Sequence, residues 1–215
     1  MKRKRAFMLK TIAVLLLAVP TWLYGQTPST ADDFNIRGLE YGMKGDYDRA
    51  ITDFTQAIRL NPNDANIYNN RGFAYYSKSD YDRSITDFTQ AIRLNSSFVV
   101  AYFNRGNAYS NKGDHDRAIA DYTQVLRLEP NADAYFRRGF AYYSKSDYDS
   151  AIADFTQAIR LDPNFVDAYN DRGIAYGRKG DLNQAIADFE TALKINPNYS
   201  DARDNLDYAR RLRGR

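Results

Sequence analysis

The fold of this chain is constrained most by a unit of 33 or 34 residues that occurs five times in tandem. One half of the unit, DYDRAITDFTQAIRLNPN in the first copy, has related copies that begin at Asp46, Asp80, Asp114, Asp147 and Asp181. An octet such as RGFAYYSK precedes each copy and begins at Arg37, Arg71, Arg105, Arg138 and Arg172. A period of this length indicates a repeat architecture, in which each unit buries its apolar face against its neighbours.

Each unit predicts a pair of α-helices. In the second half, apolar residues such as Ala50, Phe54 and Ala57 recur at helical spacing and mark one buried stripe. Asp46 can cap the start of this helix, and Pro62 cannot continue it. The octet predicts a first helix whose small residues let a neighbouring helix approach closely, and a glycine or serine supplies the turn between the two helices. The chain is therefore expected to be all-α.

The recurring residues resemble those of the tetratricopeptide repeat (TPR) family. The family pattern of an aromatic residue, Gly, Tyr, a small residue, an aromatic residue, Ala and Pro is matched in the fourth unit by Tyr135, Gly139, Tyr142, Ala151, Phe155, Ala158 and Pro163. The resemblance implies an α-α superhelix, a TPR solenoid of five helix-turn-helix repeats whose first helices line a concave groove. The repeats are expected at residues 31–64, 65–98, 99–131, 132–165 and 166–199, followed by a capping helix and basic tail over 200–215.

An arginine stands just before each repeat glycine, where the family usually has leucine. Aspartates recur in phase with these arginines, at Asp53, Asp87, Asp121, Asp154 and Asp188. We interpret the two series as a ladder of ion pairs between first and second helices, with the arginine stems packed on aromatic rings, because charges buried between helices must be neutralised. The alternative is a row of arginines that faces a ligand.

The first 30 residues predict export. Residues 1–10 contain five basic side chains, residues 11–25 carry no charge, and a polar, turn-prone stretch fills residues 26–30. This order is typical of a secretory signal, and the apolar run is shorter than the roughly 20 residues that a membrane-spanning helix needs. We expect residues 1–25 to be a cleaved signal peptide or, if uncut, a membrane anchor, with 26–30 as a linker and an exported, periplasmic or envelope-associated solenoid. A buried N-terminal helix of the domain is the remaining alternative.

The composition argues against catalytic chemistry. The chain has no cysteine, and its single histidine, His115, occupies a place that holds Tyr or Leu in the other units. Nucleophile–base pairs and histidine metal sites are therefore not expected. The aspartates lack the spacing of a calcium loop. Without the basic residues of the first ten positions, the net charge changes from +3 to −2, which gives no support for nucleic acid binding. We expect a protein that is not an enzyme and has no cofactor and no metal.

A protein or peptide partner is expected in the concave groove. By resemblance, the residues two places before each repeat glycine point into it, and amides beside aromatic rings suit an extended peptide. The candidate partner-binding residues are Asn69, Asn70, Phe103, Asn104, Asn107, Phe136, Arg137, Asn170 and Asp171. Only Asn70 matches the carboxylate clamp of chaperone-binding relatives, so that clamp is not expected.

The predicted function is a protein–protein interaction scaffold. The alternative is a self-associating structural protein of the cell envelope. The uncovered first helix, residues 32–44, would then stack against a second copy and form a homo-oligomer.

Overall fold

The computed structural model describes residues 27–214 and shows eleven α-helices and no strand in that range. The all-α prediction is therefore confirmed. Five helix pairs are followed by a single helix: α2 (Ala31–Met43), α3 (Tyr47–Leu60), α4 (Ala65–Ser77), α5 (Tyr81–Leu94), α6 (Val99–Asn111), α7 (His115–Leu128), α8 (Ala132–Ser144), α9 (Tyr148–Leu161), α10 (Val166–Lys179), α11 (Leu182–Ile195) and α12 (Ser200–Arg213).

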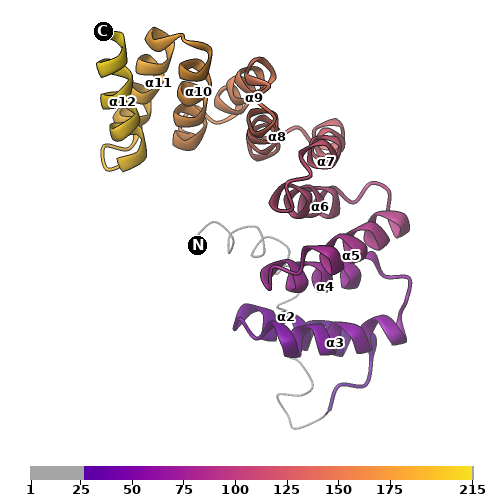
Figure 1. The fold of residues 1–215 in the computed structure, drawn as a ribbon. Coiled ribbons are helices and arrows are strands. Elements are labelled where there is room, and N and C mark those ends of the chain that lie inside the picture. The colour runs from indigo at the N-terminus through magenta and orange to yellow at the C-terminus, as the bar shows by residue number, and fades with distance from the viewer. Residues whose placement is uncertain (1–26, 215) are drawn as a thin grey trace.

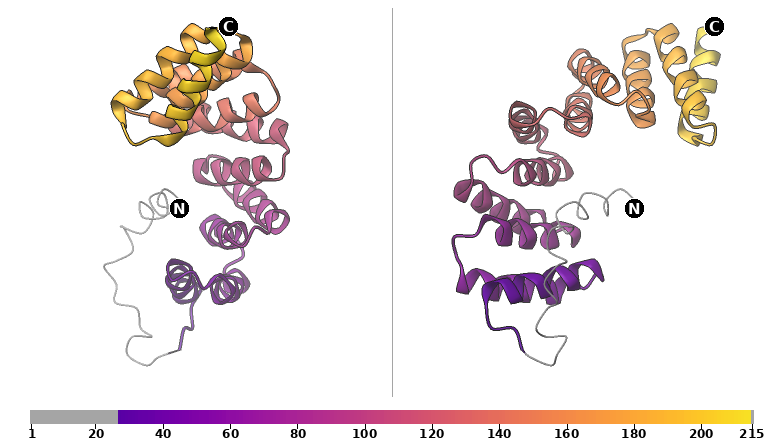
Figure 2. Two further views of the ribbon diagram at one scale, coloured as in Figure 1. Left: turned by 60° about the vertical axis from the view of Figure 1, so that its left-hand side comes forward. Right: turned by 180° about the vertical axis from the view of Figure 1, so that it is seen from behind.

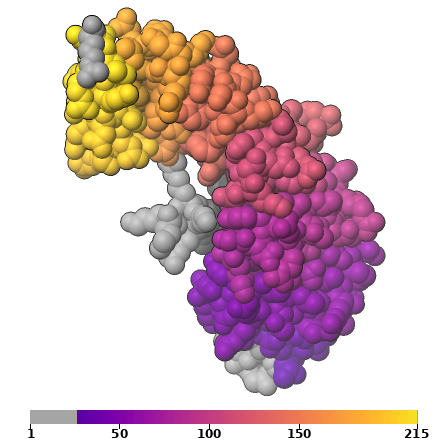
Figure 3. Space-filling view, in the orientation of Figure 1, coloured from indigo at the N-terminus to yellow at the C-terminus, as the bar shows by residue number. Residues whose placement is uncertain are grey.

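The helix pairs stack into a curved array (Figures 1 and 2). The first helices of the pairs, α2, α4, α6, α8 and α10, lie with α12 on the inner side of the arc, and the second helices lie outside (Figure 1). Each first helix contacts the next first helix, whereas contacts between successive second helices are fewer. The array therefore bends toward its first helices, and the space-filling view shows the hollow that results (Figure 3). The term inner face is used below for the side of the array on which the first helices meet one another.

The core of each pair depends on a ring that packs against the repeat glycine. A Cβ atom added to Gly72 would lie 2.8 Å from the Phe88 ring, and one added to Gly106 would lie 2.8 Å from the Tyr122 ring. Both rings are almost wholly buried. Any side chain at the glycine would displace the ring, so the glycine sets how closely the two helices of a pair approach.

The arginine–aspartate ladder is present in all five repeats. Arg105 donates through Nε and Nη2 to the two carboxylate oxygens of Asp121, both at 2.8 Å. Its guanidinium also lies over the rings of Tyr102 and Tyr109. The same paired geometry joins Arg37 to Asp53, Arg71 to Asp87, Arg138 to Asp154 and Arg172 to Asp188. The structural interpretation is therefore confirmed, and the alternative of a ligand-facing arginine row is wrong.

A third bond from four of the five ladder arginines reaches the preceding repeat, which the sequence did not predict. Arg105 Nη1 donates to Thr89 Oγ1 at 3.0 Å, so one guanidinium joins helices α5, α6 and α7. Arg71, Arg138 and Arg172 make the equivalent bond to Thr55, Thr123 and Thr156. Within residues 27–214 no second helix precedes α2, and Arg37 is correspondingly more exposed, at 29% against 17% for Arg105.

Both ends of the described array carry polar groups where the interior has small apolar ones. Ala101 and Ala108 are fully buried where α6 meets the preceding repeat, but the same places in α2 hold Asp33 and Glu40. At the other end, α12 has Asp207 at the place of the repeat glycine. Stacking a further copy onto either end would bury a carboxylate, which is costly without a partner charge.

The predicted signal or anchor segment, residues 1–25, lies outside the described residues. None of the helices within residues 27–214 is long and apolar enough to cross a membrane.

Candidate partner-binding face

Asparagines on the inner face bind one another from repeat to repeat. Asn70 Nδ2 donates to Asn35 Oδ1 at 3.0 Å, and Asn104 Nδ2 donates to Asn69 Oδ1 at 3.1 Å. Asn205 Nδ2 of α12 donates to Asn170 Oδ1 at 2.9 Å in the same way. Because each bond joins successive first helices, these amides lie where those helices meet.

The predicted amides divide into supporting residues and exposed ones. Asn69 and Asn170 are 8% and 4% exposed, so they orient their neighbours and do not line the surface. Asn70 and Asn104 are half-buried. An amide has two N–H donors and a carbonyl acceptor, so each of these two is fixed by one bond and, within the described range, keeps one N–H and its carbonyl.

Two of the predicted aromatic residues pack between helices. Phe103 lies edge-on against Tyr122, with ring centroids 5.8 Å apart. Phe136 packs against Phe155 and Phe165, with centroids 5.6 and 4.8 Å away. Both side chains remain half-buried. Phe140, one turn beyond Phe136 in α8, is 44% exposed and adds an apolar side chain to the surface.

Arg137 is an exposed cation of this region. It makes no hydrogen bond or ion pair with any residue of the described range. Asn107 accepts a bond from the Tyr122 hydroxyl at 2.8 Å, and Asn111 donates to the Tyr76 hydroxyl at 2.8 Å. Burial raises the pKa of both phenols, and the nearby positive charge of Arg137 opposes that rise. The guanidinium therefore lies close to both tyrosines.

Asp171 is the matching anion, one repeat further along. Burial raises its pKa to about 6, although a hydrogen bond from Asn170 Nδ2 at 3.0 Å acts in the opposite direction. The charged groups that act on it, Asp167 of α10 and Asp201 of α12, are both acidic and raise the pKa further. Tyr199, in the turn before α12, also lies within electrostatic reach of the three aspartates.

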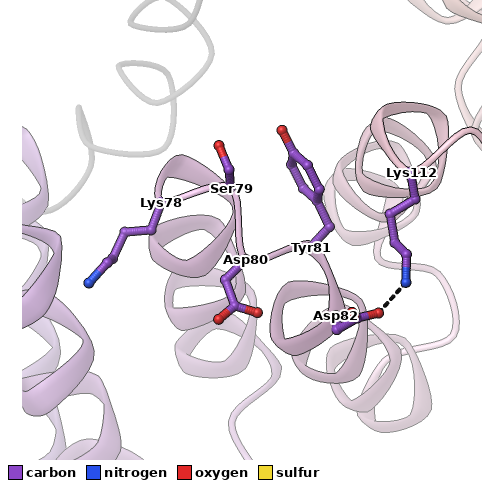
Figure 4. A pocket seen from close by; sticks show the side chains of 6 residues that line it. All are labelled: Lys78, Ser79, Asp80, Tyr81, Asp82 and Lys112. Carbon is purple, nitrogen blue, oxygen red and sulfur yellow. Dashed lines mark hydrogen bonds and ion pairs between the residues drawn. The ribbon is translucent and has the colours of Figure 1, made fainter.

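A shallow depression at the turn between α4 and α5 is a weaker candidate site. It is lined by Lys78, Ser79, Asp80, Tyr81, Asp82 and Lys112 (Figure 4). Lys112 pairs with Asp82, and Lys78 pairs with Asp48 of the preceding repeat. Asp80 caps α5 and pairs with Arg83. The charges here already have partners, so little remains to hold a ligand.

The lysines of this edge belong to a second ladder that the sequence analysis missed. Each one, from the end of a first helix, pairs with an aspartate in the first turn of the preceding second helix: Lys78 with Asp48, Lys112 with Asp82, Lys145 with Asp116 and Lys179 with Asp149. The lysine and the aspartate of each pair are 29 or 30 residues apart in the sequence. This regular spacing could have been used to predict the second ladder.

His115 lies in the first turn of α7, half-buried, and its Nδ1 atom has no hydrogen-bond partner among the described residues. No group of three or more His, Cys, Asp or Glu side chains within residues 27–214 could hold a metal ion.

The repeat geometry and the sequence comparisons identify the family. A family model described as "TPR repeat" matches residues 38–79, 74–113 and 141–180, and one described as "Tetratricopeptide repeat" matches residues 99–131 and 166–199. The chain therefore belongs to the tetratricopeptide repeat family, whose members generally mediate protein–protein interactions. A comparison with curated proteins finds no match.

Solved structures share the same architecture. A structure titled "Crystal structure of MamA" is 27% identical, covers 74% of this chain and 94% of its own, and superposes with a TM-score of 0.72. MamA from Desulfovibrio magneticus RS-1 is 20% identical, with coverages of 81% and 99% and a TM-score of 0.76. YrrB, described as a TPR protein with an unusual peptide-binding site, is 21% identical, with coverages of 80% and 89% and a TM-score of 0.71.

Proposed function

We propose that this protein is a non-catalytic scaffold that binds an extended segment of a partner protein along the inner face. The observation that carries the proposal is the row of oriented amides, in which Asn70 and Asn104 are each fixed by one bond and, among residues 27–214, keep an N–H and a carbonyl without a partner. The main chain of an extended peptide offers donors and acceptors in alternation. Amides held at the same place in successive repeats can therefore bind such a chain at successive points.

Family membership and the surface chemistry support the proposal. The TPR fold typically serves as an interaction scaffold. The exposed Phe140 and Arg137 lie on the same inner helix as Phe136, and aromatic and arginine side chains are enriched where proteins bind one another.

We also propose that the scaffold acts outside the cytoplasm. The support is the order of a basic segment, an uncharged segment and a polar boundary in residues 1–30. Fusing these residues to a reporter that is active only after export tests the idea, together with N-terminal sequencing of the full-length protein from cells. A reporter that stays inactive and a protein retained in the cytosolic fraction would contradict it.

The binding proposal is tested by a pull-down from envelope extract with the full chain in mild detergent. The test variant carries Asn70→Ala, Asn104→Ala and Arg137→Ala. The matched control carries three substitutions at exposed residues near the ends of the outer helices: Arg93→Ala, Arg127→Ala and Arg160→Ala. We expect a partner that the wild type and the control capture and that the test variant loses. Circular dichroism must show that all three proteins fold.

Capture that survives the inner-face substitutions, or that is lost equally in the outer-face control, would move the binding site away from the inner face. Capture of further copies of this chain alone would instead favour the self-associating structural protein.

A further inference from the structure

Two charged residues of the inner face, Arg137 and Asp171, stand where the asparagine pairing is interrupted. At the junctions α2–α4, α4–α6 and α10–α12, an amide donates to an asparagine of the preceding first helix. At the α6–α8 and α8–α10 junctions, the acceptor places hold Phe103 and Phe136. The donor places hold Arg137 and Asp171. Each charge therefore faces a phenylalanine of the preceding first helix where its counterparts face an asparagine.

Neither charge has an ion-pair partner among residues 27–214. All five ladder arginines are paired with a buried carboxylate, but Arg137 is exposed and unpaired within the described range. Asp171 receives one bond, from Asn170, and its charged neighbours Asp167 and Asp201 are acidic. A carboxylate that is half-buried beside like charges destabilises the free protein, so a basic group brought to it would relieve that cost.

We propose that the inner face binds an extended peptide that places an acidic side chain against Arg137 and a basic side chain against Asp171. This inference rests on the proposed function and specifies the chemistry of the partner. The half-buried ring of Phe136, the residue before Arg137 in α8, offers contact to an apolar residue. The pairing of opposite charges would also fix the direction in which the peptide runs along the array.

The spacing of the two peptide charges follows from the helix packing. Arg137 and Asp171 occupy the same place in successive repeats, on the neighbouring helices α8 and α10. Packed helices lie about 8–10 Å apart, and an extended chain advances about 3.3–3.6 Å per residue. The acidic and basic residues of the peptide should therefore be about two or three positions apart.

Peptide selection with charge-reversed protein tests the inference. A phage library of random 12-residue peptides is selected against the full chain and against the double variant Arg137→Glu with Asp171→Lys. The control carries the same exchange at two exposed residues at the ends of second helices, Arg93→Glu with Glu129→Lys. A neutral variant, Arg137→Gln with Asp171→Asn, covers the case in which the reversed protein does not fold. Dissociation constants are measured with the selected peptides made synthetically.

We expect wild type and control to select peptides with an acidic and a basic residue about two or three positions apart in one fixed order. The reversed protein should select the opposite order. Wild-type peptides should bind about tenfold more weakly to the neutral variant, because two ion pairs of moderate strength are lost.

Two outcomes would overturn the inference in distinguishable ways. Selected peptides with no charge preference, whose binding is lost with Asn70→Ala and Asn104→Ala, would refute the charge pairing and leave the inner-face scaffold intact. Peptides whose binding survives both the charge and the asparagine substitutions, or a failure to select any peptide, would count against the extended-peptide site as well.

Discussion

Replacing Asp121 by alanine tests whether the arginine–aspartate ladder holds the repeats together. The substitution removes both bonds that Asp121 accepts from Arg105 and leaves a guanidinium whose side chain is only 17% exposed. Burial disfavours that charge, and it is the bonds to Asp121 that raise the pKa of Arg105 above its ordinary value.

Breaking a buried pair by removing one partner costs about 3–5 kcal/mol. Arg105 keeps its bond to Thr89 and its contact with two tyrosine rings, so we expect the lower end, a loss of about 3 kcal/mol in the free energy of unfolding. Asp53→Ala should cost less, about 1–2 kcal/mol, because Arg37 is more exposed and has no threonine partner in the described range.

Guanidinium chloride unfolding followed by circular dichroism measures these losses. Because repeat arrays can unfold in parts, hydrogen exchange of the α6 and α7 amides should be measured in parallel. The double variant Arg105→Met with Asp121→Leu should recover most of the loss, since it leaves no unpaired charge. Losses below about 0.5 kcal/mol for both Asp121→Ala and Asp53→Ala, within the range of ordinary surface substitutions, would refute the stabilising role of the ladder.

Three further predictions concern the turns, the groove charge and the ends of the array. Ser79 and Ser146 adopt a left-handed backbone (φ 63°) where other repeats have glycine, so replacing each by glycine should raise the free energy of unfolding by about 0.5–1 kcal/mol in chemical denaturation. Asp171→Asn should stabilise the protein above pH 6 by up to about 3 kcal/mol. The pKa of Asp171 is about 6 in the folded protein against 3.8 in the unfolded chain, so the stability of the wild type falls as pH rises between these two values. The difference in stability between the two proteins, measured by urea unfolding, should therefore vanish near pH 4. Asp33→Ala with Glu40→Ala should create an apolar end on α2 and make the molar mass in light scattering rise with concentration, whereas wild type should show no rise.

The fold and the ladder could be predicted because both repeat with the period of the chain. A residue that recurs every 33 or 34 positions occupies the same environment in each unit, so Arg105 and Asp121 could be paired from their phase alone. The bond from Arg105 to Thr89 has the same regularity, yet it could not be assigned. It crosses between repeats, and its partner depends on how one pair stacks on the next.

The inner face was harder to predict because burial there depends on neighbouring repeats. Asparagine is a polar residue that is usually exposed. Asn69 and Asn170 are nevertheless buried, because the following first helix covers each of them and supplies the amide that binds it. The raised pKa of Asp171 depends on Asp201, which belongs to a helix outside the repeats. A single repeat contains too little information to place any of these three side chains.

Two nearly identical segments of the chain help to distinguish residues that build the framework from residues that form the binding surface. Residues 71–93 and 138–160 differ at only three of 23 positions, and both segments build the same ladder, ring packing and turn. The residue just before them differs in charge, Asn70 in one repeat and Arg137 in the other. The framework within the two repeats is nearly identical and requires neither residue, although the facing residue of the preceding first helix also differs, Asn35 for Asn70 and Phe103 for Arg137. The unpaired Arg137 and the unfavourably buried Asp171 contribute nothing evident to folding, and charges that are kept at a cost to stability are a mark of functional surfaces. These two side chains, more than the periodic ones, should therefore determine which partner the scaffold selects.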